Sequence, residues 1–166
     1  MVNFIYYCAV SGSSVWELPY GMDEQHPDCL ALKVAITEEL SSLYSMGVTD
    51  FVCNAEYGVP LWTAEAIVAM RNLWENPVRI HLFMPHEGQA NLWNDDARER
   101  FFNLHAAADS VTTLNRQFHE NCYRETDEYM MKRSIMLLTD GGNEYMTEYA
   151  KSLNKHVEHI KALIPR

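Results

Sequence analysis

Short apolar runs alternate with longer amphipathic segments along the chain. The short runs stop at residues that favour turns, so we interpret them as strands, and those that hold Cys8 and Cys53 as buried strands. The longer segments carry apolar residues at near-helical spacing, as between Leu30 and Leu43, and are interpreted as helices. The pattern predicts strands at 3–10, 51–53, 78–83, 110–114, 134–138 and 156–160. It predicts helices at 28–45, 61–73, 91–107, 125–133 and 144–153.

Local signals mark several helix ends. Asp28 is expected to cap the first helix, because its side chain can accept a backbone hydrogen bond, and Gly47 is expected to end it. Pro60 suits the first turn of the second helix, where its missing N–H has no helical partner.

Regular alternation of strands and helices predicts an α/β fold with three layers. We expect a mainly parallel central sheet with helices on both faces. The 166 residues fit one domain spanning 1–166, and 48% apolar residues suffice for a core. In such sheets ligands bind outside the carboxyl ends of the strands, so the residues after each strand are the candidate site.

Four loops follow predicted strands and are rich in small and polar residues. Glycine lets the backbone approach a ligand closely, and helix N-termini supply free N–H donors for anions. Each loop alone could equally be a simple turn. Because all four meet at one edge of a parallel sheet, they predict a pocket for a nucleotide-like ligand. The loops are Ser11-Gly12-Ser13-Ser14, Asn54 to Gly58, Pro85 to Gln89, and Asp140 to Asn143.

Composition excludes several classes of function. A net charge of −10, from 13 basic and 23 acidic residues, argues against binding of duplex nucleic acid. No stretch approaches the roughly 20 apolar residues of a membrane span. The four cysteines lack metal-type spacing, the histidines are dispersed, and neither a metal site nor a required cofactor is expected. Buried, unpaired cysteines indicate a reduced, cytoplasmic protein.

Several short motifs together resemble a known family. They are Ser11-Gly12, the helix entry Gly58-Val59-Pro60-Leu61-Trp62-Thr63-Ala64-Glu65, the stretch with Pro85, Gln89 and Trp93, then Arg100, Ala108-Asp109, Tyr129-Met130, and Gly141-Gly142 through Tyr149-Ala150. This set resembles the YpsA-like branch of the SLOG superfamily, a Rossmann-like group that includes the LOG enzymes and DprA. The resemblance spans nearly the whole chain.

The chain also departs from that branch. Ser13-Ser14 replaces a basic or aromatic continuation, Leu61 stands where an acidic residue is usual, and Thr126-Asp127 replaces an Arg-Asn pair. Asn143 stands where threonine is usual. These changes remove polar contacts that the family would offer, so the pocket could be retuned to another ligand.

The resemblance implies binding of a nucleotide or an ADP-ribose-like molecule without its transformation. Such a protein acts as a sensor, or as a sponge that sequesters a signalling nucleotide, a role that suits a phage-encoded anti-defence protein. The residues expected to contact the ligand come from the four loops and the following helices. They are Ser11, Gly12, Ser13, Ser14, Asn54, Glu56, Tyr57, Gly58, Trp62, Glu65, Pro85, Gln89, Asp140, Gly141, Gly142, Asn143 and Tyr145.

Two alternatives remain open. A LOG-like nucleotide N-glycosidase would use Glu148 or Glu65 as its acid–base carboxylate, but in the register that agrees best with the YpsA-like pattern Met146 takes the catalytic position. The other alternative is an interaction protein with a vestigial pocket. In each case a homodimer or higher homo-oligomer is the expected assembly.

Overall fold

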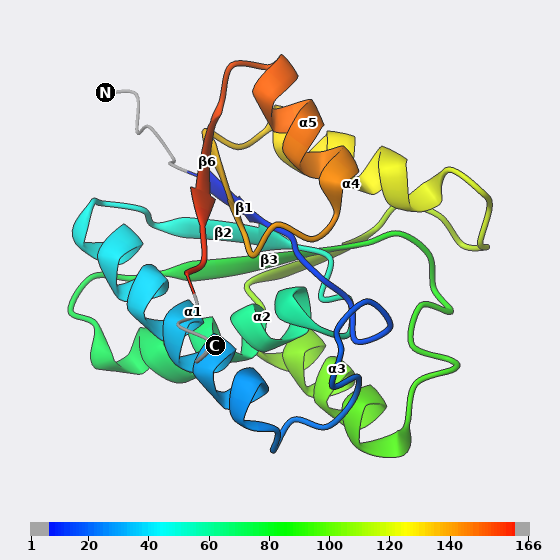
Figure 1. Cartoon of the computed structure of the whole chain (residues 1–166). Coiled ribbons are helices and arrows are strands. Elements are labelled where there is room, and N and C mark those ends of the chain that lie inside the picture. The colour runs from blue at the N-terminus through cyan, green and yellow to red at the C-terminus, as the bar shows by residue number, and fades with distance from the viewer. Residues whose placement is uncertain (1–6, 162–166) are drawn as a thin grey trace.

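The computed structural model describes residues 7–161, which form a six-stranded parallel sheet between two layers of helices (Figure 1). The strand order is β4-β3-β2-β1-β5-β6, and every neighbouring pair is parallel. The strands are β1 Tyr7–Val10, β2 Asp50–Cys53, β3 Arg79–Met84, β4 Ser110–Thr113, β5 Met136–Thr139 and β6 His156–His159. The helices are α1 Pro27–Ser45, α2 Val59–Met70, α3 Asp95–Ala107, α4 Cys122–Lys132 and α5 Glu144–Ser152, with a short 3-10 helix η1 at Arg71–Leu73.

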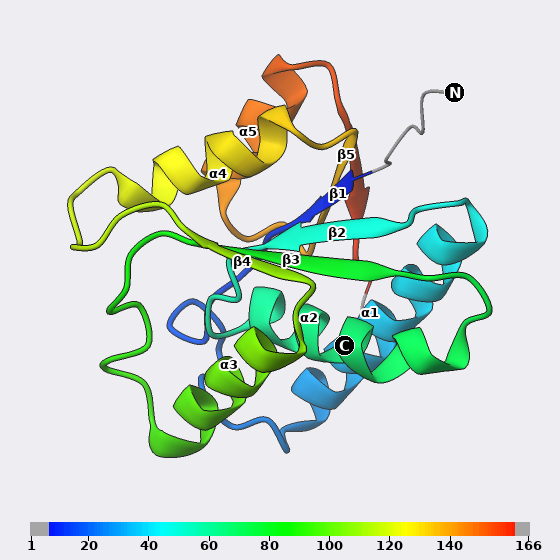
Figure 2. The same cartoon turned by 180° about the vertical axis from the view of Figure 1, so that it is seen from behind.

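Helices α1, α2 and α3 cover one face of the sheet, and α4 and α5 cover the other (Figures 1 and 2). Successive strand residues point to opposite faces. Cys8 and Val10 of β1 therefore pack in the core under α1–α3, while Ala9 packs with Met130 and Met146 under α4 and α5. Because both faces of the central strands are covered, β2 and β5 are buried throughout, which explains their continuous apolar runs.

The predicted Rossmann-like α/β fold is confirmed, and the sheet is wholly rather than mainly parallel. Element boundaries differ at a few places for local reasons. The predicted helix at 91–107 begins at Asp95, because Asn94 accepts a hydrogen bond from the N–H of Ala97 and caps it. The predicted strand at 134–138 begins at Met136, because the N–H of Ser134 still bonds to the end of α4.

The caps were predicted in part. His26, not Asp28, is the cap of α1, since its ring nitrogen accepts the N–H of Asp28. Gly47 follows that helix with φ +95°, and Pro60 lies in the first turn of α2, both as expected. Helix α4 begins at Cys122, three residues before the predicted start, and residues 3–6 of the first predicted strand lie outside the described residues.

The strand order places a topological switch point beside β1. The chain adds β2, β3 and β4 in turn on one side of β1, then crosses to the other face through α4 and adds β5 and β6 on the other side. The loops after β1 and β5 therefore diverge to opposite faces of the sheet. Ligands of open α/β sheets bind in the crevice that this divergence creates.

All four cysteines, Cys8, Cys29, Cys53 and Cys122, are buried and free. Burial raises the pKa of the Cys53 thiol to about 12, so it is a poor nucleophile at neutral pH. Across residues 7–161, no helix combines the length and the apolar character that crossing a membrane requires.

Candidate functional site

A pocket of about 350 Å³ opens at the carboxyl edge of the sheet, at the switch point between β1 and β5. Its walls come from the loops after β1, β2 and β5, from Pro60 at the start of α2, and from the N-terminal parts of α4 and α5. The lining residues are Ser11, Gly12, Ser14, Trp16, Glu17, Asn54, Glu56, Pro60, Tyr123, Arg124, Asp127, Asn143 and Tyr145.

Glycines let the three loops of the pocket pack backbone against backbone. A Cβ on Gly58 would lie 2.3 Å from the carbonyl oxygen of Ser13, and one on Gly142 would lie 2.3 Å from the N and Oγ atoms of Ser13. Both distances are below any real contact, so only glycine fits. These glycines therefore hold the loop after β1 between its two neighbours, rather than leaving space for a ligand.

Ser11 forms part of the inner wall and ends β1. Its side chain is buried, with 3% of the residue exposed. In the part of the chain that the structure describes, its hydroxyl oxygen has no hydrogen-bond partner. A buried polar group without a partner costs about 1–3 kcal/mol, so this hydroxyl is a candidate to bond a molecule held in the pocket.

Glu56 provides a carboxyl group from the β2 side. Its Oε2 accepts a hydrogen bond from Nε2 of Gln89 at 3.0 Å, and the Tyr123 hydroxyl also donates to it. Gln89 donates in addition to the backbone carbonyl of Asn54 at 2.9 Å, which fixes the loop. Burial raises the pKa of the Glu56 carboxyl, while the hydrogen bonds from Gln89 and Tyr123 act in the opposite direction.

Asp127 provides a second carboxyl group, from α4. It is only 5% exposed, and Nδ2 of Asn143 donates to its Oδ2 at 3.0 Å. Burial raises the pKa of Asp127 to about 7, although the hydrogen bond from Asn143 opposes the shift. Asn143 adopts a left-handed conformation (φ +56°) at the start of α5, and its Oδ1 accepts the N–H of Met146. Titratable groups with raised pKa values in a pocket are typical of functional sites.

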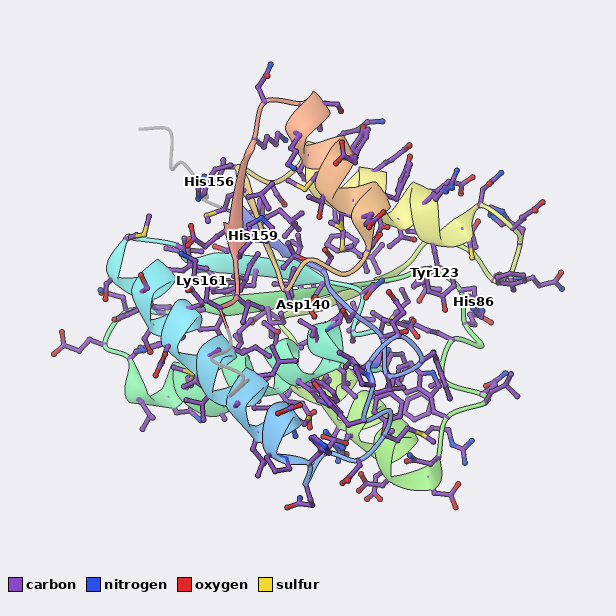
Figure 3. The ribbon with its side chains drawn as sticks, in the orientation of Figure 1. His86, Tyr123, Asp140, His156, His159 and Lys161 are labelled. Atoms are coloured by element: carbon purple, nitrogen blue, oxygen red, sulfur yellow. The ribbon has the colours of Figure 1, made fainter. Side chains whose placement is uncertain are left out.

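Aromatic side chains line the outer part of the pocket. The guanidinium of Arg124 lies over the Tyr145 ring, 4.7 Å from its centre, and the Tyr145 hydroxyl donates to Glu128. Tyr123 contacts His86 edge to face, with ring centres 5.9 Å apart, and Figure 3 shows the two side by side. Such rings offer surfaces on which a nucleobase can stack.

The structure brings together some of the predicted ligand-binding residues and not others. Those that line the pocket are Ser11, Gly12, Ser14, Asn54, Glu56, Asn143 and Tyr145. Ser13, Gly58, Gln89, Asp140 and Gly142 lie behind it, where they hold the loops together. Tyr57, Trp62, Pro85 and Gly141 do not line it. Tyr57 and Trp62 are buried in the core under α1–α3.

Neither carboxylate considered for catalysis lies in the pocket. Glu65 pairs with Arg100 on α3, with Oε1 2.7 Å from Nη2, and Arg100 also binds Glu24. Glu148 is exposed on α5, with Lys151 4.0 Å away as its ionic partner. Neither Glu65 nor Glu148 is among the residues that line the pocket.

The sequence-based site omitted Trp16, Glu17, Pro60, Tyr123, Arg124 and Asp127. Half of these residues belong to α4, which reaches the pocket because it crosses to the other face at the switch point. One signal could have identified Asp127: Thr126-Asp127 occupies the position at which the family that the sequence resembles carries Arg-Asn.

A second polar cluster lies near the amino ends of β2, β3 and β4. The buried carboxylate of Asp50 lies 2.7 Å from Nε2 of His81, whose Nδ1 lies 2.7 Å from Oγ of Ser110. The cluster joins the edge strand β4 to the interior. It lies at the opposite end of the strands from the pocket, and none of its residues lines the pocket. Nowhere in residues 7–161 do three or more His, Cys, Asp or Glu side chains gather in a way that could hold a metal ion.

Comparison with known proteins agrees with the fold. The YpsA family model, described as the YspA SLOG family, matches residues 8–163. Proteins named UPF0398 from Staphylococcus aureus strains JH9 and JH1 are each 23% identical to this chain, over 92% of it and 81% of their own length. Since the family match spans the sheet, its helices and every loop of the pocket, the chain belongs to the YpsA family of SLOG proteins.

Proposed function

We propose that this protein binds a nucleotide-derived small molecule in the pocket at the switch point, without transforming it. The buried Ser11 hydroxyl, which has no partner among the described residues, carries the proposal, because it lies where a ligand would enter the sheet edge. The aromatic rings of Trp16, Tyr123 and Tyr145 support a stacked base. Membership of a SLOG family supports a nucleotide-related ligand.

Binding without catalysis is favoured by the placement of Glu65 and Glu148. Both are engaged or exposed away from the pocket, so neither is positioned to protonate a leaving base. We accordingly propose a sensor, or a sponge that sequesters a signalling nucleotide in the cytoplasm, assembled as a homo-oligomer.

A second candidate is hydrolysis of an N-glycosidic bond with Asp127 as the general acid. It is favoured by one observation: a buried carboxyl group with a pKa of about 7 lines the pocket, and such a group can donate a proton at neutral pH. Incubation with nucleoside monophosphates and ADP-ribose, read by chromatography, tests it. Release of free base that D127N abolishes would establish hydrolysis, whereas unchanged substrates leave binding as the function.

Ligand capture by the purified protein tests the main proposal. Mass spectrometry of the small molecules released on denaturation is expected to recover an intact nucleotide-derived compound. The same compound, added back, should raise the melting temperature of the ligand-free protein.

The variant S11A sharpens this test. Removing a buried hydroxyl that lacks a partner should leave the ligand-free protein at least as stable, yet lower the affinity for the ligand about tenfold. S41A, an exposed serine on α1, is the control and should change neither quantity. Equal affinity of S11A and the unmodified protein would contradict the assignment of Ser11.

A further inference from the structure

Two backbone amides of the loop after β1, those of Ser13 and Ser14, are already bonded to carboxylates of the protein itself. The N–H of Ser13 donates to Oδ1 of Asp140 at 2.9 Å, and the N–H of Gly142 donates to the same oxygen at 3.0 Å. The N–H of Ser14 donates to Oε1 of Glu17 at 3.2 Å, and the Ser14 hydroxyl donates to it at 3.1 Å. The amides that the sequence predicts as an anion cradle therefore hold two internal anions.

The first turn of α2 is equally unavailable to an anion. The N–H of Val59 donates to the carbonyl of Ser13, Pro60 has no N–H, and the N–H of Leu61 donates to the carbonyl of Glu56. A helix N-terminus attracts phosphate through free amides, and here those amides are used to join the loops.

The charged side chains that line the pocket also disfavour a phosphate group. Three carboxyl groups line it, from Glu17, Glu56 and Asp127. Among the described lining residues, Arg124 is the only one with a positively charged side chain, and it is exposed at the outer part of the pocket. A phosphate chain at the inner wall would face carboxylates without a compensating cation.

The same groups suit a ligand that presents hydrogen-bond donors. Carboxylate oxygens accept bonds from sugar hydroxyls or from the amino group of a base. The buried Ser11 hydroxyl adds a further group that lacks a partner in the described chain and can bond to the same part of the ligand.

We propose that the pocket selects the uncharged nucleoside part of its ligand, an inference that rests on the function proposed above. Glu17 acts as an internal anion that excludes phosphate from the loop after β1. Glu17 and Asp140 differ in whether their hydrogen bonds hold two loops together. Asp140 joins the loops after β1 and β5 and belongs to the scaffold (Figure 3). Glu17 is exposed and bonds only to Ser14 among the described residues, so its charge can be removed without breaking a contact between two loops.

Calorimetric titration with adenosine, AMP, ADP and ATP, and with the matching guanosine series, tests this inference. With the unmodified protein we expect the better nucleoside to bind at least about tenfold more tightly than its triphosphate. In E17Q the affinity for the triphosphate should rise about tenfold, because one negative charge is removed, while the affinity for the nucleoside should change less than about twofold. The control is E38Q, an exposed carboxylate on α1, which should leave both affinities unchanged.

The outcomes separate the two proposals. If the triphosphate binds most tightly and E17Q leaves the ratio of its affinity to that of the nucleoside unchanged, the proposal that Glu17 excludes phosphate is wrong. The proposal of nucleotide binding then stands. If no compound of either series binds to the unmodified protein or to E17Q, both proposals are overturned.

Discussion

The side-chain amide of Asn143 donates a hydrogen bond to the buried carboxyl group of Asp127 across 3.0 Å. This contact joins the start of α5 to α4 and closes one wall of the pocket. Burial raises the pKa of Asp127 from its ordinary 3.8 to about 7, against the effect of the Asn143 hydrogen bond and together with repulsion from Glu128. At pH values between 3.8 and about 7, the folded chain therefore binds more protons at Asp127 than the unfolded chain does.

We predict that the free energy of unfolding falls as the pH rises from about 4 to about 7. The sign follows because stability decreases with pH wherever the folded state binds more protons, and Asp127 contributes on the order of 2–4 kcal/mol over this range. Urea denaturation of D127N should lack this contribution, whereas D95N, an exposed carboxylate, should retain it. Identical pH profiles for D127N and the unmodified protein would show that Asp127 titrates normally.

Removal of His81 should lower the free energy of unfolding, because the Asp50 carboxylate that it contacts is buried. Asp50 is 1% exposed, and its Oδ1 lies 2.7 Å from Nε2 of His81. H81A should destabilise the protein by about 2–4 kcal/mol, because a buried charge loses a partner. S110A, which removes only the exposed end of the cluster, should cost less than about 1 kcal/mol. Chemical denaturation measures both values, and an equal loss in the two variants would contradict this account.

Substitution of Gly58 should damage the pocket through the backbone. In G58A the new Cβ would lie 2.3 Å from the Ser13 carbonyl oxygen, so the loop after β1 must shift. We expect a loss of roughly 2–4 kcal/mol together with weaker ligand binding. G47A is the matched control: φ is +95° there, but nothing lies within 4 Å of its Cβ, so only conformational strain of about 1 kcal/mol is expected. Comparable losses in the two variants would argue against the loop contact.

Glu65 should matter for stability and not for the ligand. It pairs with Arg100, which also binds Glu24, and thereby joins α2, α3 and the segment before α1. Since these groups are only partly buried, E65Q should cost about 1 kcal/mol and change ligand affinity less than twofold. The exposed E148Q should change neither. A tenfold loss of affinity in E65Q would return this residue to the ligand site.

The fold was predictable because the parallel sheet is covered on both faces. Its inner strands β1, β2, β3 and β5 are then short, largely apolar runs between helices, and the alternation is visible in the sequence. The residues directly after the strands, such as Ser11, Asn54 and Asn143, were found for the same reason. Glu65 does not line the pocket beside them, because it lies six residues beyond the start of α2, roughly 9 Å along the helix axis.

Other features depend on contacts between distant segments. The early start of α4 has a weak local signal, since residues 115–124 are mostly polar, and so the helix predicted at 125–133 leaves out Tyr123 and Arg124. The occupation of the Ser13 and Ser14 amides by Asp140 and Glu17 arises from loop packing and side-chain rotamers. The Ser14–Glu17 contact lies within a local Ser-x-x-Glu stretch, whereas the bond from Ser13 to Asp140 joins segments 127 residues apart and has no short motif. Gly58 and Gly142, which suggested an open cradle, instead serve close loop contacts.

The bond between Ser13 and Asp140 spans 127 residues of the chain. A cavity whose walls are so far apart in the sequence is absent from any intermediate in which β5 has not yet docked beside β1. Closing such long loops is slow, so the cavity forms late in folding. A bound molecule consequently stabilises the chain as a whole and should slow proteolysis at distant sites as much as at the cavity itself.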